Sequence, residues 1–132
     1  MLDFIAKGLA KVFGTKSDRD IKELLPLVKD INLEFDGLKG ISDDQLRGKT
    51  QEIKDQINAH LKSFDDKIIS IKSSIDELAA TAIHEKDQLF NQIDQIEKDR
   101  DQALEEVLMK VLPKAFAVVK ETARRFKELG GL

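Results

Sequence analysis

The amino-acid sequence predicts an all-α protein, and three observations favour this class. Charged residues make up 36% of the 132 residues, a composition typical of solvated helices. Gly and Pro number only 7 and 2, too few for the many turns of a β protein. Apolar residues recur every three or four positions over most of the chain, which is the period of an amphipathic helix.

The first expected element is a short amphipathic helix that ends at Gly14. Lys7 and Lys11 lie opposite its apolar face, which comprises Leu2, Ile5, Leu9, Val12 and Phe13. Such a segment can lie on an anionic membrane surface. It can equally dock on its own protein, and the pattern does not decide between these alternatives.

The second expected helix begins at Ser17, whose hydroxyl can cap the free backbone N–H groups. Its apolar stripe comprises Ile21, Leu24, Leu25, Val28 and Ile31. Pro26 lies inside this stripe and predicts a kink, because proline cannot donate the helical hydrogen bond. Residues 32–42 contain two glycines and are expected to form a short helical turn and a loop.

A long helical segment is expected to start after Ser42, which forms a capping box with Gln45. Eight apolar positions then alternate at spacings of four and three, the pattern of a coiled-coil seam: Ile57, Leu61, Phe64, Ile68, Ile71, Ile75, Leu78 and Ala82. The pattern blurs over 79–86. It resumes less regularly through Phe90, Ile93, Leu104, Val107 and Val111, with Glu97 and Arg100 at seam positions.

The last expected helix starts at Pro113, since a proline suits the first helical position. Its apolar stripe comprises Phe116, Val119, Ala123 and Phe126. Arg124, Arg125 and Lys127 occupy its last turn, where cations suit the helix dipole, and Gly130 ends it.

The sequence offers no catalytic, cofactor-binding or metal-binding residues. It contains no Cys, and neither His60 nor His84 has a partner at metal-ligand spacing. Gly14-Thr15-Lys16-Ser17 lacks the full spacing of a phosphate-binding loop. The paired carboxylates Asp65-Asp66 and Glu105-Glu106 are expected to face solvent. A formal net charge of −3 argues against a nucleic-acid binder.

Three runs taken together resemble the N-terminal segment of the SecA family, the preprotein-translocase motor ATPases of bacteria. They are Phe13-Gly14-x-x-Ser17-Asp18-Arg19, then Leu38-x-x-Ile41-Ser42-Asp43-Asp44-Gln45-Leu46-Arg47-x-Lys49-Thr50-x-Glu52, and finally Leu112-Pro113-x-Ala115-Phe116-Ala117-Val118-Val119-Lys120-Glu121-x-Ala123-x-Arg125. The resemblance covers about 1–57 and 109–128. The roughly fifty residues between these parts resemble a helical insertion found in the Bacteroidetes branch of the family.

The resemblance implies three regions: N-terminal motor helices over 1–57, an inserted coiled-coil hairpin over 58–108, and a helix over 109–132 that leads toward a nucleotide-binding domain. Because the ends of an insertion must lie close together, we expect a long antiparallel coiled-coil helical hairpin with its tip near Ala79–Glu85. The first arm would pack on Leu89 or Phe90, Ile93, Leu104 and Val107. The full fold prediction is therefore a short amphipathic N-terminal helix, a kinked second helix, this hairpin and a C-terminal helix.

By resemblance, the parent protein uses ATP and Mg to move preproteins through the SecYEG channel. This chain lacks the phosphate loop and the acidic box, so no ATPase activity and no cofactor are expected of it. The residues expected to contact anionic phospholipid and the channel are Leu2, Phe4, Ile5, Lys7, Leu9, Lys11, Val12, Phe13 and Lys16. The stripe Phe116, Val119, Ala123 and Phe126 would be a structural interface, and its exposure would make the isolated chain a homo-oligomer. The expected location is cytoplasmic and peripheral at the inner membrane.

A stand-alone coiled-coil adaptor or membrane-surface scaffold is the alternative hypothesis, since heptads and a basic amphipathic start suit that class as well. A helical-bundle carrier of apolar ligands is a third.

Overall fold

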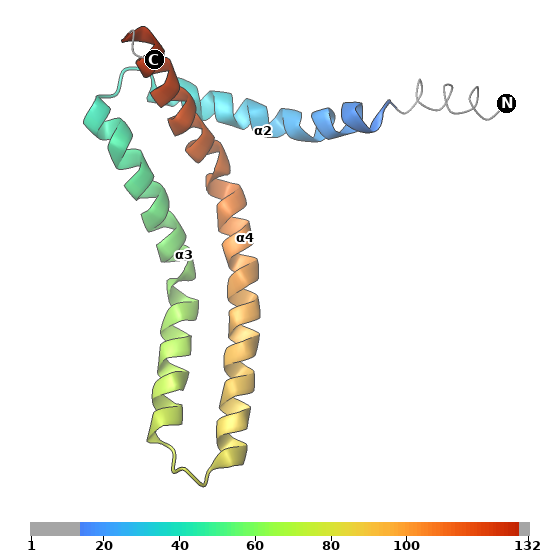
Figure 1. Ribbon diagram of the computed structural model, residues 1–132, viewed down its shortest axis with the longest axis vertical. Coiled ribbons are helices and arrows are strands. Elements are labelled where there is room, and N and C mark those ends of the chain that lie inside the picture. The colour runs from blue at the N-terminus through green and yellow to red at the C-terminus, as the bar shows by residue number, and fades with distance from the viewer. Residues whose placement is uncertain (1–13, 130–132) are drawn as a thin grey trace, which may run out of the picture.

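A computed structural model describes residues 14–129, which form three α-helices in this part of the chain. These helices are α2 (Lys16–Leu38), α3 (Asp43–Glu77) and α4 (Ile83–Glu128). The long helices α3 and α4 lie side by side and run in opposite directions, while α2 crosses the end of the pair and projects away from it (Figure 1). The all-α class is confirmed. The amphipathic helix predicted for the first thirteen residues lies outside the described residues.

The start of α2 differs from the prediction, because Thr15 rather than Ser17 is the N-cap. The Thr15 hydroxyl accepts a hydrogen bond from the backbone N–H of Asp18 at 3.1 Å. The Asp18 carboxylate in turn accepts one from the backbone N–H of Thr15 at 2.8 Å. Gly14, with φ +73°, turns the chain immediately before this capping box. The capping box therefore forms between Thr15 and Asp18, although Ser17 also has an aspartate, Asp20, three residues later.

The end of α2 also lies later than predicted, because residues 32–38 are helical. Phe35 and Leu38 pack against Leu46 and Ala117 from the other two helices. This contact stabilises a helical segment that Gly37 alone would disfavour. Pro26 lies inside α2, and the kink there stays a prediction.

The capping box predicted at the start of α3 is confirmed. The Ser42 hydroxyl accepts a hydrogen bond from the backbone N–H of Gln45 at 3.2 Å. The Gln45 side-chain carbonyl accepts one from the backbone N–H of Ser42 at 2.9 Å. Gly40, with φ +88°, lies in the short turn that precedes this cap.

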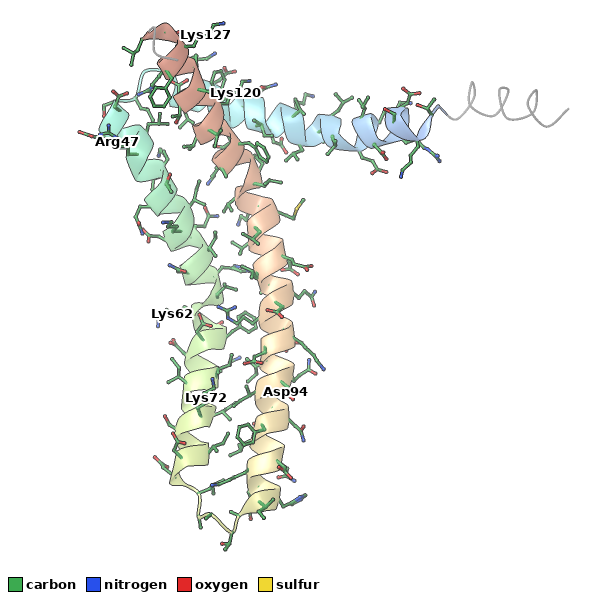
Figure 2. The ribbon with its side chains drawn as sticks, viewed as in Figure 1. Arg47, Lys62, Lys72, Asp94, Lys120 and Lys127 are labelled. Atoms are coloured by element: carbon green, nitrogen blue, oxygen red, sulfur yellow. The ribbon has the colours of Figure 1, made fainter. Side chains whose placement is uncertain are left out.

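The chain reverses direction at 78–82, which overlaps the predicted tip. Lys72 of α3 consequently lies level with Asp94 of α4 (Figure 2). Apolar side chains from both helices form one cluster around buried isoleucines, with these members: Ile68, Ile71, Ile75, Leu89, Ile93 and Ile96. Coiled-coil packing of the side chains remains a prediction.

The facing stripe of α4 is more regular than the sequence suggested. Leu89 packs against α3, whereas Phe90 is 51% exposed. Of the two residues predicted as alternatives, Leu89 is therefore the one that contacts the first arm. The assignment of Glu97 to the seam was wrong, because Glu97 is exposed and Ile96 takes that place. Arg100 is half-buried, and its Nε donates to Asp65 of α3 at 2.6 Å. Asp65 is thus not a purely solvated carboxylate.

The separate C-terminal helix predicted from Pro113 was wrong, because α4 continues through this residue as one 46-residue helix. Proline costs such a helix one backbone hydrogen bond. Val111 and Ala117, on either side of it, are buried. The packing of these flanking turns against the other helices explains why the helix does not end.

Candidate functional site

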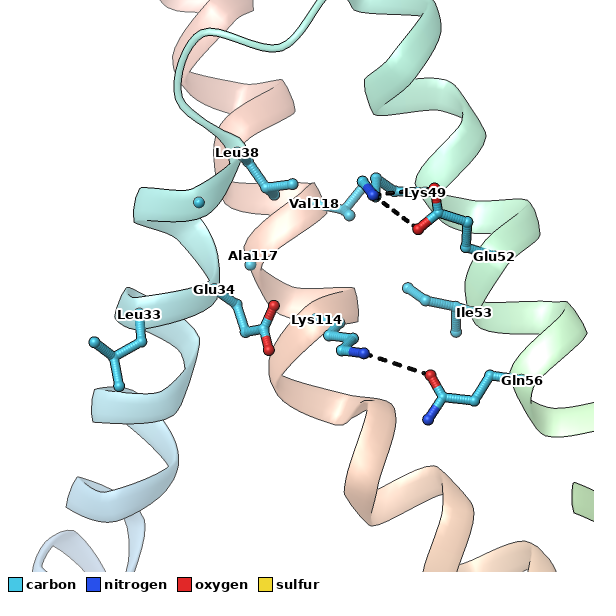
Figure 3. Close-up of a pocket in the computed structure, with 11 residues that line it drawn as sticks. Leu33, Glu34, Leu38, Lys49, Glu52, Ile53, Gln56, Lys114, Ala117 and Val118 are labelled. Atoms are coloured by element: carbon cyan, nitrogen blue, oxygen red, sulfur yellow. Dashed lines mark hydrogen bonds and ion pairs between the residues drawn. The ribbon is translucent and has the colours of Figure 1, made fainter.

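A groove of about 410 Å³ lies where α2, α3 and α4 meet (Figure 3). All three helices contribute to its lining, which comprises Leu33, Glu34, Gly37, Leu38, Lys49, Glu52, Ile53, Gln56, Lys114, Ala117 and Val118. This size is in the range of sites that hold a few side chains of a partner or a small ligand.

The groove combines an apolar floor with a polar rim. Leu38 and Ala117 at the floor are buried. At the rim, Lys49 forms an ion pair with Glu52 at 2.8 Å, and the Lys114 ammonium donates to the Gln56 side chain at 3.5 Å. Glu34 has no hydrogen-bonded or ion-paired partner among residues 14–129. Such a surface suits contact with another polypeptide, where apolar side chains supply contact area and rim charges supply specificity.

Side-chain contacts to α4 hold α2 in its projecting position. The Lys120 ammonium donates to the Asn32 side chain at 2.6 Å and lies 4.3 Å from the centre of the Phe35 ring. A cation over an aromatic face is attracted by the ring quadrupole. The Lys39 ammonium also lies over this ring, at 5.1 Å. These contacts position one wall of the groove.

A buried ionic cluster fixes the C-terminal part of α4 to the turn between α2 and α3. The Glu121 carboxylate is fully buried and accepts hydrogen bonds at 2.8 Å from both Arg124 and Arg125. Arg125 also donates to Asp43 at 2.6 Å and to the backbone carbonyl of Ile41 at 2.8 Å. We call these five residues the Glu121 clasp. Sequence reasoning missed it.

The hydrogen bond from Arg124 lowers the pKa of Glu121 from 4.5 to about 2, with a further contribution from Arg125. Burial acts in the opposite direction, because it disfavours the charged carboxylate. Glu121 is therefore ionised at neutral pH and serves as an acceptor that organises two arginines. A buried carboxylate of this kind suits a structural role.

The described residues contain no group of three or more His, Cys, Asp or Glu side chains that could hold a metal ion. His60 and His84 are both exposed, and the side chain of His84 lies 3.2 Å from that of Gln88.

The predicted interface stripe lies on the exposed side of α4. Phe116 is 52% exposed, Val119 67% and Phe126 56%, and Ala123 is exposed as well. Of the predicted membrane and channel contacts, Lys16 lies in the first turn of α2. The others lie outside the described residues.

Comparison with known proteins decides the family. The model of the SecA DEAD-like domain matches residues 9–130. This chain belongs to the SecA family. The protein translocase subunit SecA of Cytophaga hutchinsonii is 53% identical over 127 residues, which cover 94% of this chain. That of Chloroherpeton thalassium is 49% identical over 119 residues and 90% of the chain, and that of Amoebophilus asiaticus is 40% identical over 122 residues and 92%.

These matches confirm the resemblance to the N-terminal SecA segment of Bacteroidetes-like proteins. Because each alignment covers at least 90% of the chain, it includes most of the inserted residues between the family runs. The chain spans about 11% of the length of these relatives. No solved structure matches it. Among the described residues, none of the helices is long and apolar enough to cross a membrane.

Proposed function

We propose that this chain is the N-terminal part of an ATP-driven translocase that moves preproteins through the SecYEG channel. In this proposal the chain is not catalytic, and ATP with Mg is bound by other parts of the parent protein. Its own role is to brace the motor and to contact the channel and the membrane. The proposal is supported by family membership, by the groove and by the apolar residues exposed on α4.

The exposed stripe on α4 carries the bracing role. Burying a Phe or Val side chain stabilises a protein by roughly 1.5–3 kcal/mol relative to leaving it exposed. About half or more of this stabilisation is absent for each of three side chains that are at least 52% exposed: Phe116, Val119 and Phe126. In a parent about nine times longer, a nucleotide-binding domain is the expected cover. In the isolated chain a second copy would cover the stripe, which makes self-association part of the proposal.

The membrane role rests on the first sixteen residues, which carry three lysines and one aspartate among apolar residues. Roughly 1 kcal/mol per lysine near an anionic surface gives weak and salt-sensitive attachment. The proposal therefore places the parent in the cytoplasm, peripherally at the inner membrane.

A binding measurement tests the bracing role. The SecA of Cytophaga hutchinsonii would be produced without its matching N-terminal segment and mixed with this chain. We expect a one-to-one complex that is lost when Phe116→Ser and Val119→Ser are combined. Ile69→Ser is the matched control, because Ile69 is 63% exposed on α3, away from the stripe. Failure of the unaltered chain to bind would favour a stand-alone adaptor and would overturn the bracing role.

A further inference from the structure

One face of α4, distant from α3, combines carboxylates with large apolar side chains. At about 100° per residue, eight residues fall within roughly 40° of one line along the helix. All are exposed: Ile83, Asp87, Phe90, Asp94, Glu97, Asp101, Glu105 and Leu108. We call this set the acidic-apolar face. It spans 25 residue steps, or about 37 Å of helix.

Among residues 14–129 the carboxylates of this face are compensated only weakly, because Arg100 attracts Glu97 and Asp101 without pairing with them and is itself paired with Asp65. None of the five forms an ion pair within residues 14–129. The carboxylates that do have side-chain partners on this part of α4 point elsewhere: Asp99 binds Gln95, and Glu106 binds Gln102. Lys86 and Lys98 lie only at the edges of the face. The acidic-apolar face is therefore a strip of unbalanced negative charge.

Three large apolar side chains interrupt this strip. Ile83 is 68% exposed, Phe90 51% and Leu108 44%. Ile83 and Phe90 are seven residues apart, so they lie two helical turns apart on the same side. Apolar area at this spacing matches the stripe of a second helix, which repeats with the same period.

Charge decides which class of partner fits this face. Nucleic acids and anionic lipid surfaces carry negative charge and would be repelled. A polypeptide segment with lysines or arginines between large apolar residues would satisfy both features. We propose that the acidic-apolar face binds a basic amphipathic helix of another polypeptide. This inference does not depend on the bracing role, because it concerns the opposite end of α4.

Isothermal titration calorimetry with the full chain tests the inference. The probe is a 14-residue peptide of leucine and lysine in amphipathic helical order, and a leucine–glutamate peptide of the same order is its counterpart. We expect the basic peptide to bind, binding to weaken as salt is raised, and the acidic peptide not to bind.

Two double variants make the test specific. Asp94→Asn with Asp101→Asn removes two charges from the face and should weaken binding about tenfold. Asp99→Asn with Glu106→Gln removes two charges at the same spacing from another side of α4 and should change binding less than twofold. Phe90→Ser should weaken binding about fivefold, because the peptide can bury only the half of the Phe90 surface that is exposed in the free chain.

Chemical-shift mapping locates the bound peptide. We expect perturbed amide signals to concentrate over 83–108. Perturbations centred on 116–126, equal effects of the two double variants, equal binding of the acidic peptide, or no binding at all would each overturn the inference. Circular dichroism of every variant verifies that the helices are retained.

Discussion

Replacing Glu121 by glutamine is expected to destabilise the fold strongly at neutral pH. The substitution keeps the size of a fully buried side chain but removes its charge. The side-chain NH₂ of glutamine is a hydrogen-bond donor, and it would face guanidinium N–H groups that are donors as well. At least one of the hydrogen bonds from Arg124 and Arg125, each 2.8 Å long, must therefore be lost.

The magnitude follows from the burial of the cluster. Breaking a buried ion pair by removing one partner costs about 3–5 kcal/mol. Arg124 can regain part of this by turning to water, because its side chain is 37% exposed, whereas that of Arg125 is only 17% exposed. We therefore expect a loss of about 2–4 kcal/mol, a substantial part of the roughly 5–15 kcal/mol by which domains are stable.

Urea unfolding followed by circular dichroism measures this loss as a decrease in midpoint of about 1–2 M. Glu128→Gln is the matched control, because Glu128 binds the same guanidinium of Arg124 but is 61% exposed. An exposed pair contributes about 0–1 kcal/mol. Equal loss in the two variants would refute the reasoning that burial of Glu121 determines its contribution.

The pH dependence of the free energy of unfolding provides a second measure of the contribution of Glu121. Folding lowers the pKa of Glu121 from 4.5 to about 2, so its ionised form stabilises the folded state. This contribution is fully present above pH 4.5 and is lost as the pH falls from 4.5 toward 2. The stability difference between the unaltered chain and Glu121→Gln should therefore shrink over that interval.

Three further predictions concern other parts of the chain. Ile71→Asp should cost more than about 2 kcal/mol in thermal unfolding, because it puts a charge into the isoleucine cluster, whereas Lys72→Asp on the exposed side should cost less than about 0.5 kcal/mol. Arg100→Met should change stability by less than about 1 kcal/mol despite the 2.6 Å contact with Asp65, since both side chains are partly exposed; a larger loss in urea unfolding would contradict this. Deleting 2–13 should abolish co-sedimentation with anionic vesicles, and equal binding to neutral vesicles would contradict a charge-assisted contact.

Local signals in the sequence were sufficient where neighbouring residues decide the structure. The capping box at Ser42 and Gln45 lies within four residues, and it was predicted correctly. Thr15 and Ser17 are equally good caps by residue type. Each is also followed three residues later by an aspartate, Asp18 or Asp20, so the capping-box pattern alone does not choose between them.

Long-range contacts explain what the sequence did not reveal. Glu121 lies in a charged run that looks solvated, and its burial depends on a turn about eighty residues earlier in the chain. Pro113 ends a helix by local rules, yet tertiary packing overrides them here. Ile96 and Glu97 both fit a spacing of three and four between Ile93 and Arg100, and only the packing against α3 shows that Ile96 is the seam residue. The groove was not predictable, because three distant segments line it.

The most direct test of the central claim is a translocation assay with a chimeric motor. This chain would replace the matching segment of the SecA of Cytophaga hutchinsonii, to which it is 53% identical. We predict that the chimera imports a preprotein into vesicles containing the SecYEG channel at a rate close to that of the unaltered motor, and that combining Phe116→Ser with Val119→Ser removes this activity. A chimera that folds and hydrolyses ATP but does not move the preprotein would contradict the proposal that this chain is the N-terminal part of a protein translocase.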